Sequence, residues 1–455
     1  MKHYTRTLSL FLFISFAFSQ TQLGSDIDGE AQGDYSGWSV SMNSAGDRVA
    51  IGAANNAGTG SNAGHVRIYE YSNSSWTQLG SDIDGEAQGD YSGTSVSMNS
   101  AGDRVAIGAE NNDGTASNAG HVRVYEYSNS SWTQLGSDID GEAQGDWSGN
   151  SVSMNSAGDR VAIGALFNGG TGTDAGHVRI YEYSNSSWTQ LGSDIDGEAA
   201  NDRSSYSVSM NSAGDRVAIG ARRNDGTASD AGHVRIYEYS NSSWTQLGSD
   251  IDGEAASDFS GTSVSMNSAG DRVAIGATDN DGTASDAGHV RIYEYSNSSW
   301  TQLGSDIDGE AANDWSGTSV SMNSAGDRVA IGALLNDGTA SNAGHVRVYS
   351  LAELFIDSQQ LLPDKFTLDQ NYPNPFNPIT TLRYELPENG LVNITIYDMV
   401  GRQVKTLVNQ RQDAGYRSII WDATNDNGKP VSAGIYIYQI QAGGNMQTKK
   451  MVLLK

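Results

Sequence analysis

The chain has 455 residues, enough for roughly two to four domains, a formal net charge of −27 and no cysteine. Without cysteine, disulfides and thiolate chemistry are excluded. The negative excess lies in residues 20–350, which contain no lysine, so this region is a polyanion and nucleic acid is excluded as a partner. After the first twenty residues, no apolar run approaches the roughly 18 residues of a membrane span.

The N-terminus has the pattern of a cleavable secretory signal. Basic side chains precede an apolar run from Leu8 to Phe18, and Ala17-Phe18-Ser19 fits the small-x-small cleavage pattern. We therefore predict a signal peptide over residues 1–19. The alternative, a buried N-terminal helix, is disfavoured because a repeat begins immediately behind this segment.

One segment, TQLGSDIDGEA, recurs six times at a constant interval of 56 residues without an insertion. It begins at Thr21, Thr77, Thr133, Thr189, Thr245 and Thr301. A fixed period of this size is typical of propellers and solenoids, in which each unit buries its apolar face against its neighbours.

Each unit predicts four short strands from alternating apolar and polar residues rich in β-branched and aromatic types. In the first unit they are Trp38–Asn43, Asp47–Ala53, Gly64–Tyr71 and Ser75–Ile83, separated by Gly, Asn, Ser and Asp turn residues. Four antiparallel strands repeated six times predict an all-β fold, a six-bladed β-propeller over residues 20–350. A β-solenoid is the alternative.

The two ends of the repeat region predict how the propeller closes. The region opens on a fourth-strand segment, Gln20–Asp28, and its last unit stops after the third strand, Gly344–Ser350. We expect the first segment to complete the last blade, which would leave no unpaired strand edge.

The repeat also resembles the FG-GAP repeat of integrin α-subunit-type propellers. The resemblance lies in GDYSGWSVSMNSAGDRVAIGA followed by AGHVRIYEY, and all six copies over residues 21–350 share it. Two features depart from that family, which usually has seven blades and an Asp-rich calcium loop between the first two strands. Here there are six copies, and Asn43–Asp47 (NSAGD) replaces the loop, so the family's usual metal site is expected to be absent.

The C-terminal hundred residues resemble the type A sorting domain of the type IX secretion system. The resemblance rests on NYPNPFNP at Asn371–Pro378, on the alternating segments that follow it, and on a terminal TKKMVLLK. All six prolines of the chain lie between Pro363 and Pro430. We predict a linker over residues 351–365 and a small Ig-like β-sandwich over residues 366–455. The resemblance implies that residues 366–455 engage the type IX machinery, and that the protein is secreted or displayed on the outer surface of a Gram-negative bacterium.

Differences among the six copies are concentrated at three places. Two lie in the loop before the first strand, at the positions of Tyr35 and Trp38, and the third is the residue pair after each VAIGA. In an up-and-down blade these loops emerge on one face, so we predict that this face carries recognition, centred on the third and sixth copies. Neutral drift is the alternative, although SNSS on the opposite face is unchanged. The predicted ligand-binding residues are Tyr35, Trp38, Trp147, Leu166, Phe167, Tyr206, Arg222, Arg223, Phe259, Trp315, Leu334 and Leu335.

Acidic residues and histidines also recur in every copy. Asp26, Asp28, Glu30 and Asp34 follow the spacing of oxygen ligands for calcium, and the favoured alternative is that Asp28-Gly29 forms a turn, Asp34 caps the next loop and the others are solvated. The repeated histidines are His65, His121, His177, His233, His289 and His345. Equivalent positions on a propeller lie too far apart to share one metal ion, so we expect these histidines to pack at the start of their strands.

The sequence as a whole favours binding over catalysis. No serine lies in a nucleophile elbow, no general base is unique to one copy, and no cofactor is expected apart from calcium. We expect a secreted or surface protein that recognises a glycan or a protein through one loop face. A structural acidic coat or matrix protein is the alternative, and a hydrolase on a propeller is a third, weaker one.

Overall fold

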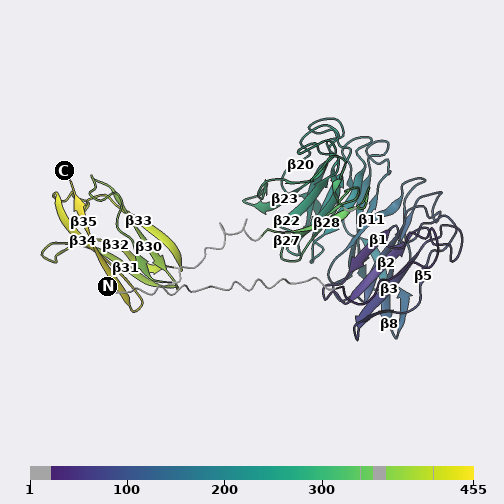
Figure 1. Cartoon of the computed structure of the whole chain (residues 1–455), viewed down its shortest axis with the longest axis horizontal. Coiled ribbons are helices and arrows are strands. Elements are labelled where there is room, and N and C mark those ends of the chain that lie inside the picture. Colours follow the sequence, from purple (N-terminus) through teal and green to yellow (C-terminus); the bar gives the residue numbers. More distant parts are fainter. Residues whose placement is uncertain (1–21, 339, 352–364, 413, 455) are drawn as a thin grey trace, which may run out of the picture. The chain divides into compact units, whose positions relative to one another are not determined.

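The computed structural model describes residues 22–338, 340–351, 365–412 and 414–454, and all its regular elements there are strands. The chain divides into two compact units, Met1–Leu351 and Ala352–Lys455, each of which is drawn in Figure 1. The predicted signal peptide (1–19) and nearly all of the predicted linker (351–365) fall outside the described residues. In the described part of the chain, no helix is long and apolar enough to span a membrane.

The first unit consists of one sheet per sequence copy, and the first sheet sets the pattern. It contains β1 (Ser39–Met42), β2 (Arg48–Ala53), β3 (His65–Ser72), β4 (Ser75–Gln78) and β5 (Ile83–Asp84). The order is β1-β2-β3-β4, all antiparallel, and β5 pairs with the beginning of β3 where β4 has ended. The single fourth strand predicted for this unit is therefore two short strands, β4 and β5, which pair with different parts of β3.

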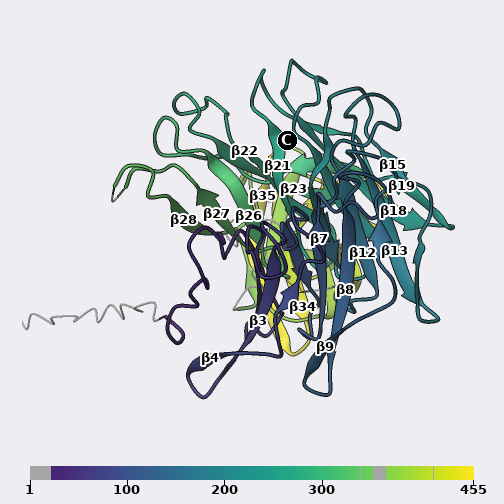
Figure 2. The ribbon, with the colours of Figure 1, turned by 90° about the vertical axis from the view of Figure 1, so that its right-hand side faces the viewer.

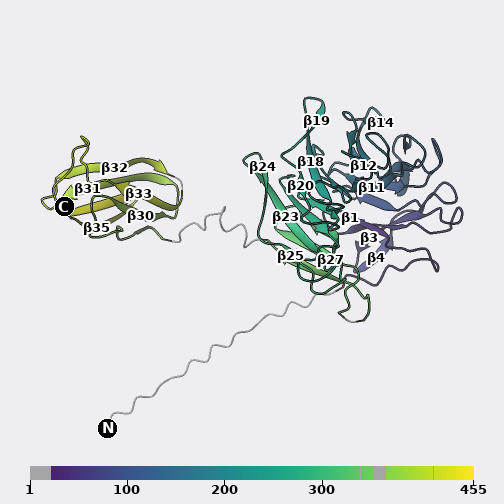
Figure 3. The same ribbon diagram turned by 90° about the horizontal axis from the view of Figure 1, so that it is seen from above.

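The next four sheets repeat this arrangement, and Figure 3 shows several of them side by side. The second contains β6 (Ser95–Met98), β7 (Arg104–Ala109), β8 (His121–Ser128), β9 (Ser131–Gln134) and β10 (Ile139–Asp140). The third contains β11 (Ser148–Met154), β12 (Arg160–Ala165), β13 (His177–Ser184), β14 (Ser187–Gln190) and β15 (Ile195–Asp196). The fourth contains β16 (Ser204–Met210), β17 (Arg216–Ala221), β18 (His233–Ser240), β19 (Ser243–Gln246) and β20 (Ile251–Asp252). The fifth contains β21 (Ser260–Met266), β22 (Arg272–Ala277), β23 (His289–Ser296), β24 (Ser299–Gln302) and β25 (Ile307–Asp308).

The hydrophobic core lies between consecutive sheets, not within one. The layer between the first two sheets combines Val66 and Ile68 of β3 with Val105 and Ile107 of β7, all nearly inaccessible to solvent. Equivalent layers follow between the later sheets. Alternate side chains of a strand point to opposite faces, so each middle strand contributes apolar side chains to the core layers on both sides of its sheet. This explains why the stretch VAIGA is apolar almost throughout.

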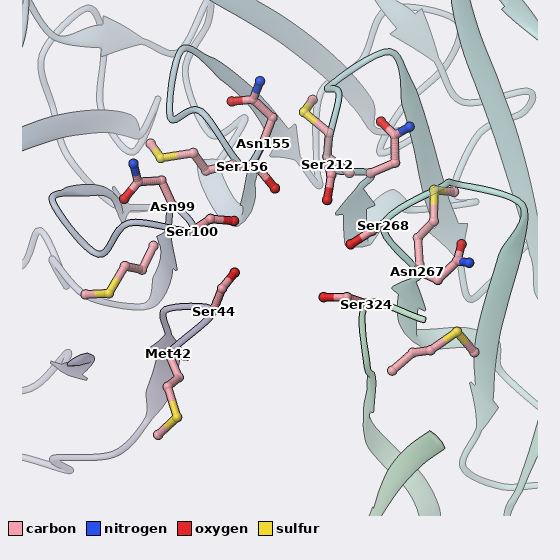
Figure 4. Close-up of a pocket in the computed structure, with 16 residues that line it drawn as sticks. Met42, Ser44, Asn99, Ser100, Asn155, Ser156, Ser212, Asn267, Ser268 and Ser324 are labelled. Carbon is pink, nitrogen blue, oxygen red and sulfur yellow. The ribbon is translucent and has the colours of Figure 1, made fainter. Parts of the chain in front are cut away.

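Hydrogen bonds between copies hold each sheet to the next in an identical way. The backbone amide of Ser100 donates to the carbonyl of Ser156 at 3.2 Å, and the amide of Met154 donates to Ser97 Oγ at 2.9 Å. The same pair of contacts recurs at every interface from the first sheet to the sixth. Figure 4 shows the six equivalent serines pointing into a pocket in the middle of the array.

The sixth sheet has only three strands, β26 (Ser316–Met322), β27 (Arg328–Ala333) and β28 (His345–Ser350), which Figure 2 shows at one edge of the array. The prediction that Gln20–Asp28 completes this blade is wrong for its described part, residues 22–28, which form no strand pairing with β28. Val346 and Val348 are 67% and 66% exposed because no further sheet of the described structure packs against β28, whereas the equivalent Val290 is fully buried.

The N-terminal segment instead packs against the first sheet. The indole Nε1 of Trp76 donates to the carbonyl of Leu23 at 2.8 Å, and Arg67 Nη2 donates to the carbonyl of Asp28 at 2.7 Å. The arginine bond recurs between every later pair of sheets, and the tryptophan bond recurs as far as the fifth sheet, as from Trp132 to Leu79. The segment thus occupies the place of an outer strand in front of the first sheet.

The array is therefore an open arc of six sheets. Met42 in β1 is 54% exposed, whereas the equivalent Met98 is 7% exposed because the preceding sheet covers it. Ser44 and Ser324, both labelled in Figure 4, stand at the two ends of the series of serine contacts. Among the described residues, no hydrogen bond between these two serines continues the series. The predicted all-β fold with a four-stranded repeat is confirmed, with the closing strand as the exception.

The second unit is a β-sandwich, as predicted. One sheet contains β29 (Thr367–Leu368), β30 (Thr380–Leu386) and β33 (Gly415–Trp421), and the other contains β31 (Gly390–Asp398), β32 (Gln403–Gln412), β34 (Gly434–Ala442) and β35 (Asn445–Leu453). Trp421 is fully buried between the sheets, where it packs on Phe376 and Tyr436 at ring distances of 5.5 and 5.2 Å. One core made from both sheets gives this unit its own stability.

Candidate functional site

Strand pairing brings the varied positions together at one end of each sheet. In the third sheet Ser148 pairs with Ala165, so the chain enters β11 beside the point where it leaves β12. Trp147 immediately precedes this pair, and Leu166 and Phe167 immediately follow it. The fourth and fifth sheets repeat the register. The predicted common face therefore exists, and we call it the varied face.

The loop before each first strand has a strained backbone that aims the varied side chain. The first varied residue has a left-handed φ between 52° and 55° in all six copies: Tyr35, Tyr91, Trp147, Arg203, Phe259 and Trp315. This region is unfavourable for bulky residues, so the surrounding framework must enforce it. The preceding aspartate does so. Asp146 is buried, and its Oδ2 accepts hydrogen bonds from the amide of Ala143 and from Asn168 Nδ2, each at 3.0 Å.

Aromatic and arginine side chains of neighbouring copies stack on the varied face. The rings of Trp147 and Phe167 meet edge to face, with centroids 4.6 Å apart. The guanidinium carbon of Arg203, from the fourth copy, lies 5.0 Å from the centroid of Phe167. Such contacts are worth about 0.5–2 kcal/mol each, so this group links the third and fourth copies.

A second stack continues into the fifth copy. Arg222 lies 3.9 Å from the ring centroid of Tyr206 and 5.8 Å from that of Phe259, and Arg223 lies 6.0 Å from Phe259. Burial, together with the neighbouring charges of Arg223 and Arg222, lowers the pKa of Arg203. The Nε atoms of all three arginines are buried without a hydrogen-bond partner in the described structure. We call these three residues the arginine cluster.

The remaining predicted residues differ in exposure. Tyr35 and Trp38 are each 62% exposed, with ring centroids 6.4 Å apart. In the sixth copy Trp315 and Leu334 are exposed, and Leu335 is half-buried. Leu166, by contrast, is only 4% exposed and belongs to the protein interior, as do the equivalent Ala54 and Thr278.

The four residues predicted as a calcium set have separate roles. Gln22 Nε2 donates to Asp26 Oδ1, Asp34 holds its own loop through the amide of Ala31 at 3.0 Å, and Asp28 uses its backbone carbonyl on Arg67. Glu30 reaches a different group, the imidazole of His65. Within the described residues, these four carboxylates form no common group of ligand atoms.

Sequence reasoning missed a cluster of one histidine and two carboxylates that recurs at five places. In the clearest copy, His177 Nδ1 lies 3.9 Å from Glu142 Oε2 and 4.0 Å from Asp194 Oδ2. The glutamate follows the outer strand of one sheet, and the other two residues belong to the next sheet. The five clusters are Glu30–His65–Asp82, Glu86–His121–Asp138, Glu142–His177–Asp194, Glu198–His233–Asp250 and Glu254–His289–Asp306. The recurrence of all three residue types at fixed offsets was the available signal.

The histidines of these clusters are buried, as expected, and burial lowers the pKa of His121, His177, His233 and His289 below its usual range. Burial, assisted by the positive charge of Arg123, lowers the pKa of His121 to about 4. The same two causes, with Arg235 as the cation, lower the pKa of His233 to about 4. A neutral imidazole retains a lone pair on one ring nitrogen, which makes it either a hydrogen-bond acceptor or a metal ligand.

Comparison with known proteins identifies the second unit. Residues 370–454 match the secretion system C-terminal sorting domain. The chain therefore carries a sorting domain of the type IX system, which indicates a secreted or cell-surface protein. No curated protein sequence matches the chain.

Solved structures resemble the chain at low identity. A candidate 6-phosphogluconolactonase from Bacteroides uniformis has a TM-score of 0.49 and 9% identity, over 69% of this chain and 80% of that one. PorZ, a surface component of the type IX secretion system of Porphyromonas gingivalis, has a TM-score of 0.39 and 11% identity, over 95% of this chain and 61% of that one. The periplasmic gluconolactonase PpgL of Pseudomonas aeruginosa has a TM-score of 0.41 and 11% identity, over 78% and 94%.

Proposed function

We propose that this protein is a secreted or surface-displayed binding protein that recognises a glycan or protein ligand through its varied face. The sorting domain supports export, and the spatial order of the varied residues supports recognition. A rigid, repeated framework with varied residues at one end of the sheets is the usual arrangement of a recognition surface.

The arginine cluster is the observation that carries the proposal. Arg203, Arg222 and Arg223 occur in one copy only, in a region that is otherwise strongly acidic. The guanidinium group of each lies over an aromatic ring. Guanidinium groups bind planar carboxylate and phosphate groups with two parallel hydrogen bonds. We therefore propose that the ligand presents an anionic group to this cluster and an apolar or sugar surface to the neighbouring rings.

Further aspects of the proposal concern ancestry and catalysis. We propose that the 56-residue repeats are divergent FG-GAP repeats, on the sequence motifs given above. We also propose that the chain is not an enzyme, because the buried histidines and aspartates of the first unit recur from copy to copy. A catalytic site needs a nucleophile and a base placed differently from the rest of the framework.

The experiment is a screen of the purified chain against glycan and protein arrays, followed by affinity measurements on variants. Phe167→Ala and the pair Arg222→Ala with Arg223→Ala are expected to cost about 2 kcal/mol or more of binding free energy each. Ser74→Ala with Ser75→Ala, exposed residues at the other end of the sheet, is the control and should leave affinity unchanged. Ligand binding that survives all the varied-face substitutions contradicts the proposal. A chain that binds nothing on either array supports the alternative, an acidic coat or matrix protein.

A further inference from the structure

The five Glu–His–Asp clusters have the composition of a metal site. Each offers one imidazole nitrogen and two carboxylate oxygens, and all the ligand atoms of a cluster lie within 4.8 Å of one another. A histidine with two carboxylates is a donor set suited to zinc and related divalent transition metals, whereas calcium and magnesium prefer oxygen ligands alone. Three protein ligands leave one coordination position for water.

The distances inside the clusters are too long for hydrogen bonds and fit an intervening ion. His Nδ1 lies 3.8–3.9 Å from the glutamate oxygen in all five copies. A hydrogen bond between these atoms would need about 3 Å. A zinc ion binds nitrogen at about 2.0–2.1 Å and carboxylate oxygen at about 2.0–2.2 Å, so an ion between the two atoms spans the observed separation.

In two of the five clusters, the buried histidine has a ring nitrogen without a hydrogen-bond partner in the described structure. The side chain of His233 is 1% exposed, and its Nδ1 has no hydrogen-bond partner among the described residues. His289 is equally buried, and both of its ring nitrogens lack one. Buried polar atoms are nearly always satisfied in folded proteins, so an unsatisfied nitrogen repeated beside two carboxylates indicates a missing partner.

The local charge also matches a divalent cation. Around His177 Nδ1, carboxylate oxygens of Glu142, Asp194 and Asp196 lie within 4.0 Å, and Arg179 lies 3.5 Å from Glu142 on the same cluster. Three carboxylates and one guanidinium sum to two negative charges. The carboxylates are 34–43% exposed and can close on an ion without repacking the core.

From these observations we propose that each of the five Glu–His–Asp clusters binds one divalent transition-metal ion, with zinc as the expected occupant. In four of the clusters the glutamate and the other two ligands belong to consecutive sheets, so each of these ions joins two neighbouring sheets, and the ion at Glu30 joins the N-terminal segment to the first sheet. Ions that bind only the folded state raise its stability in proportion to the logarithm of their concentration. The proposed zinc set shares Glu30 with the calcium set predicted from the sequence, but takes its other ligands, His65 and Asp82, from the first sheet.

The test is a zinc titration of the full chain after removal of metal with a chelator, measured by calorimetry and by elemental analysis after dialysis. About five zinc ions per chain are expected, with a rise in melting temperature. Glu142→Gln combined with Asp194→Asn should lower the number from five to four and leave the other sites unchanged. Glu182→Gln is the matched control, since this carboxylate has the same partial exposure but pairs with Arg160, 2.7 Å away.

Three results would overturn the proposal. The first is no zinc bound after dialysis. The second is zinc bound in the same amount by the Glu142→Gln, Asp194→Asn double variant, which would indicate scattered surface carboxylates. The third is displacement by an equal concentration of calcium, which would show that imidazole does not contribute. A cobalt-substituted chain supplies a separate readout, because cobalt bound by nitrogen and oxygen ligands at a four-coordinate site absorbs visible light. The double variant removes one site in five, so it should reduce this absorption by about a fifth.

Discussion

The tryptophan of each outer strand provides a direct test of the open arc. Trp188 is 8% exposed, and its Nε1 donates to the carbonyl of Leu135 in the preceding copy at 2.7 Å. Trp76 makes the same bond, at 2.8 Å, to Leu23 of the N-terminal segment, but Leu23 is 54% exposed and no sheet lies beyond it in the described structure. The same substitution at both positions therefore compares an internal interface with the open end.

Trp188→Phe should cost about 2–4 kcal/mol of the free energy of unfolding. Loss of the indole N–H leaves the carbonyl of Leu135 without its donor, at a cost of about 1–3 kcal/mol. Removing roughly 40 Å² of buried apolar surface adds about 1 kcal/mol at 25 cal/mol per Å². Trp76→Phe should cost less than about 1 kcal/mol, because water replaces the lost bond at an exposed carbonyl.

Urea denaturation followed by far-UV circular dichroism measures both free energies without relying on tryptophan emission. Trp244→Phe is the internal control, since Trp244 has the same burial and the same 2.7 Å bond as Trp188, and it should cost the same within about 0.5 kcal/mol. Equal costs for Trp76→Phe and Trp188→Phe would refute the open arc. They would mean that the N-terminal segment is buried in solution by the sixth sheet, in a closed ring.

Three further predictions follow from single contacts. In the cysteine-free chain, the pair Ser268→Cys and Ser324→Cys should form a disulfide, because their backbones are bonded at 3.1 Å, whereas Ser324→Cys with Ser44→Cys should keep two free thiols in a thiol titration. Glu110→Gln should stabilise the fold at pH 7 by a fraction of ~1 kcal/mol, because burial raises the pKa of this carboxyl; the gain should disappear as the pH falls through that pKa and the native carboxyl becomes protonated. Trp421→Ala should unfold the sandwich, at about 3–5 kcal/mol, and leave the protein in the periplasm of a host with a type IX machine, detected by cell fractionation.

The repeated sheets could be predicted because period and alternation are local properties of the sequence. The expected strand Asp47–Ala53 corresponds to β2 (Arg48–Ala53), and Gly64–Tyr71 corresponds to β3 (His65–Ser72). The break in the outer strand was missed. Gly80, with φ of 80°, lies at that break, and a Cβ there would approach Trp132 of the next sheet to 2.8 Å. The break thus depends on a contact with the neighbouring copy. The alternation of apolar and polar residues within one unit does not reveal such a contact.

The parts of the site that could not be predicted depend on contacts between copies. The varied face followed from strand parity alone, but the burial of Leu166 depends on how its loop packs. The predicted calcium set consists of carboxylates close together in sequence, whereas Glu30 meets His65, thirty-five residues later, because the N-terminal segment packs against the first sheet. Spacing along a loop does not reveal a partner on another sheet.

Closure of the ring was the least predictable feature, because it depends on geometry that every copy shares. Nearly identical units make nearly identical interfaces, as the repeated serine contacts show, so the same rotation applies from each sheet to the next. A ring closes only where the number of copies multiplied by this rotation equals a full turn. Six copies fall short here, and one interface cannot take up the difference without losing its hydrogen bonds and its apolar layer. The first and sixth sheets consequently expose the residues that are buried everywhere else, Met42 on one side and Val346 on the other.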